Sequence, residues 1–150
     1  MPDASAVDAG AAVPTRGLLD ASVVIGLDEL DPTVLPSETA VSSITIAELA
    51  AGPHATRDLD ERARRQERLQ RTEATFEPLP FDANAARAYG RIYAAVLVAG
   101  RKARGSRAVD LLVAAVALSA KLPLYTRNPA DFAGLNELVN VVTVSPEQRG

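Results

Sequence analysis

GLLDASVVIGLDEL, residues 17–30, predicts a strand that leads directly into a helix. The apolar run 17–19 has the composition of a short buried strand, and it ends in an acid, Asp20. Apolar residues then recur at helical spacing, at Val24, Leu27 and Leu30. A strand followed at once by a helix is the first part of the unit from which parallel sheets are built.

The same alternation continues along the chain. Further strands are predicted at residues 39–43, 122–126 and 139–144, and further helices at 44–51, 57–75, 82–98, 111–120 and 129–132. Residues 76–81 contain two prolines and predict an edge strand. The helix at 57–75 is dense in charge, with only Leu59, Ala63 and Leu69 for a buried stripe, whereas 111–120 is apolar all round and predicts a central helix. The sequence therefore predicts an α/β fold with a central parallel sheet.

Length and composition allow one ordinary globular domain. The chain has 150 residues, of which 47% are hydrophobic and 23% charged, and its net charge is −3. It contains no cysteine, which excludes disulfide scaffolds, thiolate zinc sites and cysteine nucleophiles. The negative net charge argues against a generic basic nucleic-acid binder.

The first residues predict a flexible arm, residues 1–16, before a domain that covers residues 17–150. The arm carries Asp3 and Asp8 where a signal peptide would carry positive charge, and it lacks a continuous apolar segment. No run in the chain reaches the roughly 18 apolar residues that cross a bilayer. We therefore expect a cytoplasmic protein without a membrane partner.

Four acids stand where a parallel sheet would gather them. Asp20 ends the first strand, while Glu48 and Asp131 lie in the first helical turn after later strands, and Asp110 leads into the predicted central helix. Ligands of open parallel sheets bind at the carboxyl ends of the strands. Carboxylates that converge there are hard oxygen ligands, and they predict a Mg²⁺ or Mn²⁺ site.

Each acid also has a purely structural interpretation, because carboxylates stabilise helix N-termini. Thr45 to Glu48 matches a capping box, and Asn128 to Asp131 matches an N-cap with proline at the next position. Asp20 could cap its own helix. Asp110 is harder to explain in this way, because an acid beside an apolar helix loses hydration that a partner or metal must offset.

Four segments together resemble the signature segments of PIN-domain nucleases of the VapC toxin type, in the same order. They are LLDASVVIGL (18–27), VSSITIAEL (41–49), SRAVDLLVAA (106–115) and YTRNPADF (125–132). The resemblance implies a PIN-like three-layer α/β/α sandwich and a metal-dependent ribonuclease that cleaves RNA phosphodiester bonds. It also implies a homodimer and inhibition by a cognate antitoxin. Matched by position, the acidic quartet is Asp20, Glu48, Asp110 and Asp131, with Ser22, Thr126 and Asn128 as supporting residues.

A basic run before the predicted central helix is a candidate for contact with RNA phosphates. It consists of Arg101, Lys102, Arg104 and Arg107. A solvated turn between helices is the alternative, and Arg107 could instead pair with a carboxylate such as Asp110.

Other enzyme classes fit less well. The chain has a single histidine, His54, which excludes a two-histidine ribonuclease mechanism. A haloacid-dehalogenase-type phosphotransferase would carry a second aspartate where this chain has Ser22, and a dinucleotide-binding module would need more glycines than Gly26. A catalytically silent PIN-like RNA-binding or scaffolding module remains the alternative function, and it should lack one or more of the four acids.

Overall fold

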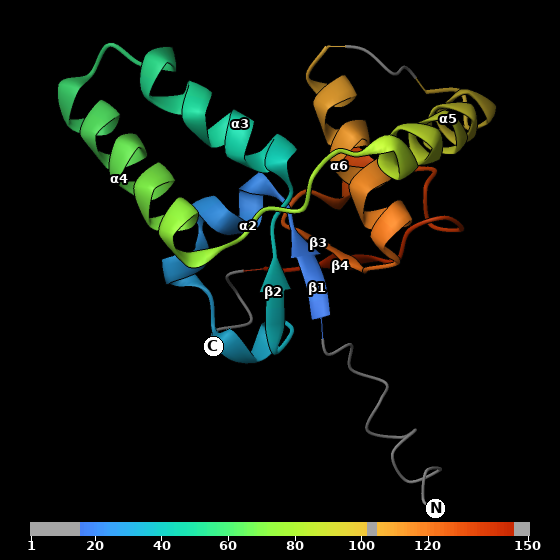
Figure 1. The fold of residues 1–150 in the computed structure, drawn as a ribbon, viewed down its shortest axis with the longest axis horizontal. Helices are drawn as coiled ribbons and strands as arrows, with labels where there is room; N and C mark the ends of the chain where they lie inside the picture. The colour runs from blue at the N-terminus through green and yellow to red at the C-terminus, as the bar shows by residue number, and fades with distance from the viewer. Residues whose placement is uncertain (1–15, 102–104, 146–150) are drawn as a thin grey trace, which may run out of the picture.

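A four-stranded parallel sheet lies at the centre of the molecule (Figure 1). The computed structural model describes residues 16–101 and 105–145. The strand order is β2-β1-β3-β4, and every pairing is parallel. The strands are β1 (Arg16–Leu19), β2 (Glu38–Ala40), β3 (Leu124–Thr126) and β4 (Val141–Thr143).

Helices connect the strands and cover both faces of the sheet (Figure 1). The α-helices are α2 (Ala21–Ile25), α3 (Ser43–Ala51), α4 (Leu59–Thr75), α5 (Ala83–Val98) and α6 (Ser106–Ala120). Short 3-10 helices are η1 (Leu27–Glu29), η2 (Pro32–Val34), η3 (Gly52–Ala55) and η4 (Pro129–Phe132).

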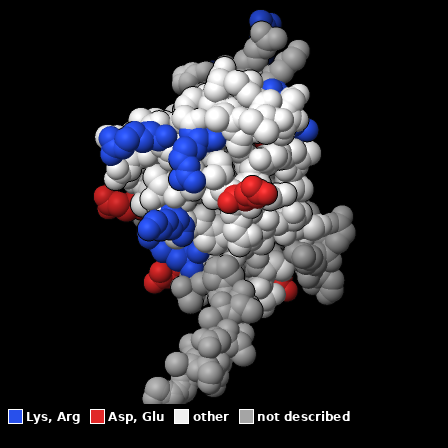
Figure 2. All heavy atoms as spheres, turned by 90° about the vertical axis from the view of Figure 1, so that its right-hand side faces the viewer, with Lys and Arg blue, Asp and Glu red and all other residues white. Residues whose placement is uncertain are grey.

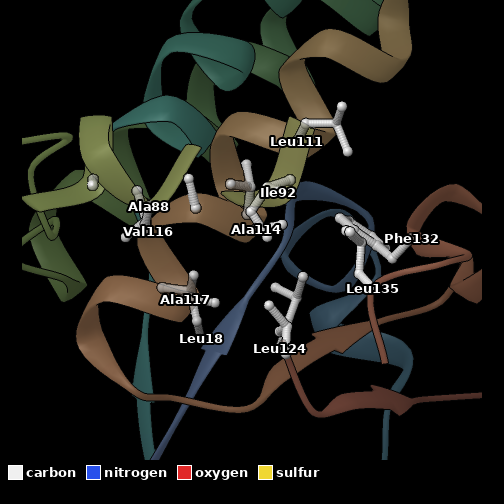
Figure 3. Close-up of a cluster of buried hydrophobic side chains, with 14 of the residues drawn as sticks. Leu18, Ala88, Ile92, Leu111, Ala114, Val116, Ala117, Leu124, Phe132 and Leu135 are labelled. Atoms are coloured by element: carbon white, nitrogen blue, oxygen red, sulfur yellow. The ribbon is translucent and has the colours of Figure 1, made fainter. Parts of the chain in front are cut away.

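Alternation of side chains along the strands produces two separate cores. Leu18 and Leu124 are fully buried on one face, where they face α5 and α6 (Figure 3). Their chain neighbours Leu19 and Tyr125 are buried on the opposite face, in a cluster that includes Val23 of α2. Because successive side chains of a strand point to opposite faces, one sheet can hold two apolar layers. The predicted three-layer α/β/α sandwich is confirmed.

The first helix is shorter than predicted. α2 ends at Gly26, whose backbone N–H bonds the carbonyl of Ser22, and the chain continues as η1 instead of one helix to Leu30. The predicted edge strand at 76–81 is reduced to a single bridge between Leu79 and Ser42. Prolines on both sides of Leu79 lack an N–H group, so the pairing cannot extend.

The charged helix and the central helix are confirmed, with corrections in detail. Leu59, predicted in the buried stripe of α4, is 74% exposed, and Thr72 is buried on that helix instead. α6 begins at Ser106 and not at Leu111, so Asp110 lies in its second turn and does not open the helix. Asp82 accepts the N–H of Ala85 and caps α5.

The predicted N-terminal arm falls outside the described residues, except for Arg16, which belongs to β1. Within the described ranges, no helix combines the length and the apolarity that crossing a membrane requires.

Candidate active site

Asp20 follows β1 directly and is both a helix cap and a candidate ligand. Its Oδ1 atom accepts the backbone N–H of Val23 at 3.2 Å and the hydroxyl of Ser22 at 2.6 Å. These bonds confirm that Asp20 caps its own helix. The residue is 7% exposed, and its Oδ2 atom accepts no hydrogen bond from any residue that the structure describes. One oxygen of the carboxylate therefore positions the side chain, while the other remains available.

Glu48 does not form the predicted capping box. α3 is capped by Ser42, whose hydroxyl accepts the N–H of Thr45 at 3.1 Å, and Thr45 is itself fully buried inside the helix. Glu48 therefore lies beyond the first turn, too far along the helix to reach its cap. Its half-buried carboxylate makes no hydrogen bond or ion pair within the described part of the chain.

The two remaining acids lie on α6 and η4. Asp110 is half-buried in the second turn of α6, and Asp131 is half-buried in η4. The side chain of Asn128 does not cap η4, contrary to the predicted N-cap, because no side-chain hydrogen bond is made there. Neither carboxylate is hydrogen-bonded or ion-paired to a residue in ranges 16–101 and 105–145.

The four acids influence one another electrostatically, although they come from four separate elements. Burial, and after it the charges of Asp110 and Asp20, together raise the pKa of Glu48 to about 7. The pKa of Asp110 is raised to about 6 by burial, with smaller contributions from the charges of Asp131 and Asp20. The charge of Arg107 opposes this shift. The fold thus brings the predicted quartet into one region at the carboxyl ends of β1 and β3.

Hydroxyl groups connect the ends of these two strands. The Ser22 hydroxyl accepts the backbone N–H of Arg127 at 2.9 Å and lies 3.4 Å from the hydroxyl of Thr126. Thr126 is fully buried and also accepts the N–H of Asn128 at 3.0 Å. The predicted supporting residues Ser22 and Thr126 therefore lie next to Asp20, while the side chain of Asn128 is exposed nearby.

Residues 18–138 match the sequence pattern of the PIN domain. The chain belongs to the PIN-domain family. It is 37% identical over 131 residues to Ribonuclease VapC5 of Mycobacterium tuberculosis, a match that covers 85% of this chain and 93% of the relative.

Solved structures agree with this PIN-domain assignment. A member of the VapBC family of toxin-antitoxin systems, VapBC-5 from Mycobacterium tuberculosis, has a TM-score of 0.77 and is 38% identical. That match covers 87% of this chain and all of the other. FitAcB from Neisseria gonorrhoeae has a TM-score of 0.62 and is 26% identical, over 87% of this chain and 97% of the other.

The described residues of the basic run, Arg101 and Arg107, contact η4, the 3-10 helix that carries Asp131. Arg107 donates to the backbone carbonyl of Asp131 at 2.8 Å, and Arg101 makes a long contact of 3.5 Å to the carbonyl of Ala130. Lys102 and Arg104 lie outside the described residues. Arg107 bonds a backbone carbonyl and does not form the ion pair with Asp110 that the sequence suggested. Its positive charge only opposes the rise in the pKa of Asp110.

Sequence reasoning missed Arg127, although it named the residues on both sides. The Arg127 side chain lies over Gly26, where an added Cβ would be 1.9 Å from its Nη1 atom. A hollow of about 570 Å³, which we call the Arg127 hollow, includes Ser22, Arg127 and Asn128 in its lining. A second hollow of about 330 Å³ includes Glu48 and Arg65. Of the four acids, Glu48 lines the second hollow and none lines the Arg127 hollow. The only signal for Arg127 in the sequence was a cation between two polar residues at a strand end.

The donor set fits a hard divalent cation. Asp20 supplies a buried oxygen without a partner in the described residues, and the raised pKa values of Glu48 and Asp110 indicate uncompensated negative charge. In residues 16–101 and 105–145, no three acidic or histidine side chains already stand close enough together to hold a metal ion. Binding of a metal ion would therefore require the carboxylates to come closer together.

Proposed function

We propose that this PIN domain is a metal-dependent endoribonuclease that acts as a toxin and is neutralised by a cognate antitoxin. The observation that carries the proposal is the gathering of four carboxylates from four elements, where burial and the neighbouring acids raise the pKa values of Glu48 and Asp110, and where no carboxylate has a cationic partner within hydrogen-bonding distance in the described residues. Such an arrangement destabilises the fold in the absence of a bound cation, and clusters of this kind are typical of binding or catalytic sites. The names of the relatives, a ribonuclease and toxin-antitoxin complexes, support this choice.

Asp20, Glu48, Asp110 and Asp131 are the residues that would hold Mg²⁺ or Mn²⁺. When bound, such an ion polarises a phosphate and lowers the pKa of a water molecule, which makes hydrolysis of a phosphodiester possible near neutral pH. The chain's own contribution is to hold its carboxylates in place. Ser22 orients the carboxylate of Asp20, and Arg107 holds the backbone of η4 near α6.

The proposed partners follow from the same site. An RNA strand must approach an acidic region, so cations at its border are needed, and Arg101, Lys102, Arg104 and Arg107 remain candidates for phosphate contact. The antitoxin is proposed from the VapBC family of the structural relative. A homodimer is proposed from exposed apolar residues of α5, which are Tyr93, Leu97 and Val98.

The test is RNA cleavage by the purified protein with Mg²⁺ or Mn²⁺ and after removal of metal with EDTA. The variants Asp20→Asn, Glu48→Gln, Asp110→Asn and Asp131→Asn should each lose roughly a hundred-fold or more in cleavage rate, because metal charge stabilisation is worth several kcal/mol. Glu67→Gln, on the exposed surface of α4, is the matched control and should cleave as the wild type does.

Two outcomes would contradict the proposal. Retention of near-wild-type cleavage by Asp20→Asn or Asp110→Asn would exclude the assigned site. RNA binding by the wild type without cleavage in either metal would favour the catalytically silent module, although all four acids are present.

A further inference from the structure

Arg127 is a half-buried cation without an anionic partner. No hydrogen bond or ion pair of its guanidinium group to a described residue is found, while its backbone N–H is bound to Ser22. Two other arginines near the acids have partners. Arg107 donates to the carbonyl of Asp131, and Arg65 donates to Glu61 and to the carbonyl of Gly52. The guanidinium of Arg127, a residue whose backbone is bonded to Ser22 beside Asp20, keeps its hydrogen-bonding groups available.

The position of this guanidinium depends on the absence of a side chain at residue 26. An added Cβ there would lie 1.9 Å from Nη1 and 3.0 Å from Cζ of Arg127. The backbone does not require glycine, because Gly26 has φ −98° and ψ 15°, which other residues adopt. The missing side chain at Gly26 thus gives the guanidinium a place beside α2, at the border of the Arg127 hollow.

The lining of the Arg127 hollow suits an anion. It combines the Arg127 guanidinium with the hydroxyl-bearing residue Thr143 and the exposed amide of Asn128, while the hydroxyl of Ser22 in the same lining is donated to Asp20. None of the described residues that line it is acidic, although Asp20 lies two residues from Ser22. Its volume of about 570 Å³ is within the range of ligand sites, roughly 300–1,000 Å³.

A polynucleotide that is cut beside an acidic site needs attraction elsewhere along its backbone. The quartet carries negative charge that repels phosphates, and a cation at a fixed position lowers this cost and sets the register of the strand. Arginine suits the task, because its planar group donates two parallel hydrogen bonds to phosphate oxygens. The Arg127 guanidinium lies beside Gly26 at the end of α2, the helix that Asp20 caps, and the Arg127 backbone N–H is bonded to Ser22.

We propose that the Arg127 hollow binds a phosphate of the RNA strand that neighbours the phosphate being cleaved, with Arg127 as its ligand. The inference rests on the proposed ribonuclease function and adds a specific subsite to it. Arg127 then acts by positioning the strand, so its loss should raise KM more than it lowers kcat.

The experiment measures binding of a fluorescein-labelled, single-stranded RNA of mixed sequence, with Ca²⁺ in place of Mg²⁺ to suppress cleavage. Arg127→Gln should weaken binding by roughly ten-fold and lower the salt slope by about 0.7, because one charged phosphate contact is lost. Arg57→Gln, an exposed arginine outside the Arg127 hollow, is the charge-matched control and should change binding less.

A second variant tests whether the position of the Arg127 guanidinium matters, and not only its charge. Gly26→Ala keeps Arg127 but displaces its guanidinium, and it should weaken binding to a similar extent. Gly90→Ala in α5, where an added Cβ meets nothing within 4 Å, is its control and should bind normally. Wild-type binding by Gly26→Ala would overturn the Arg127 hollow as the site, even if Arg127→Gln binds weakly.

Replacement of single RNA linkages by neutral methylphosphonates tests for a direct contact between Arg127 and a phosphate. A purely structural role of Arg127 would not change how RNA affinity responds to these replacements. One neutral linkage should weaken binding to the wild type but not to Arg127→Gln, because the contact is already absent there. An equal response of both proteins at every linkage would overturn the inference. A wild type that cleaves no RNA would instead overturn the proposed function, so the two failures are distinguishable.

Discussion

The Nη1 atom of Arg107 donates a 2.8 Å hydrogen bond to the backbone carbonyl of Asp131. This bond joins the first turn of α6 to η4, across 24 residues of sequence. It places two of the four acids, Asp110 on α6 and Asp131 on η4, on elements that are tied together.

Arg107→Gln should therefore loosen the site and weaken binding of Mn²⁺ by roughly ten-fold or more, as loss of outer-shell partners does in other metal sites. Titration calorimetry with Mn²⁺ measures this change. Arg101→Gln is the matched control, because its contact to Ala130 is longer, at 3.5 Å, and it should have a smaller effect. Equal metal affinity of Arg107→Gln and the wild type would contradict a positioning role.

Ser22→Ala should lower both stability and metal affinity. The Ser22 hydroxyl donates to Asp20 at 2.6 Å and accepts the N–H of Arg127, so its removal leaves both groups with one bond fewer. We expect a loss of about 1–3 kcal/mol in the free energy of unfolding, measured by urea denaturation. Ser119→Ala, which removes a hydroxyl near the C-terminal end of α6, is the control. Unchanged metal affinity of Ser22→Ala would argue against an orienting role for this hydroxyl.

Stability without divalent metal should fall as pH rises from about 4 to about 7. The pKa values of Glu48, about 7, and Asp110, about 6, lie above the ordinary values of 4.5 and 3.8. The folded state therefore holds protons in this range that the unfolded state releases, and higher pH favours unfolding. Urea denaturation in EDTA at a series of pH values measures the trend.

The variants Glu48→Gln and Asp110→Asn should each flatten this pH dependence, and saturating Mn²⁺ should oppose it, because metal binds the ionised carboxylates. Glu73→Gln, an exposed glutamate of α4, is the control. A wild type whose pH dependence matches that of both variants would contradict the raised pKa values.

The face that includes α5 should form a homodimer. Tyr93, Leu97 and Val98 are 42%, 53% and 89% exposed, and uncharged surface covers most of the view in Figure 2. Leu97→Glu should convert the dimer to a monomer in light scattering, because a charge would be buried in the interface. Leu59→Glu, at the 74% exposed Leu59 of α4, should leave the dimer intact. A monomeric wild type at tens of micromolar, a scale typical of modest interfaces, would contradict the prediction.

The order of the elements could be predicted from the sequence, and so could the four acids that the fold brings into one region. The apolar run before Asp20 and the apolar stretch that forms α6 are local patterns, because residues that are near in sequence settle whether a strand or helix is buried. Local patterns misplaced the start of α6 and suggested a capping box at Glu48. Thr45 is a residue type that often caps helices, but Ser42 lies three residues earlier and is the N-cap at which α3 begins.

How the residues of the site come together could not be predicted from local sequence patterns. The bond from Arg127 to Ser22 spans 105 residues, and the place of the Arg127 guanidinium depends on Gly26, on a different element. The hydrophobic periodicity of the sequence cannot predict such contacts, because they follow from the pairing of β1 with β3 in the sheet. The raised pKa values of Glu48 and Asp110 have the same origin, since burial and the charges of distant acids act only once the chain is folded.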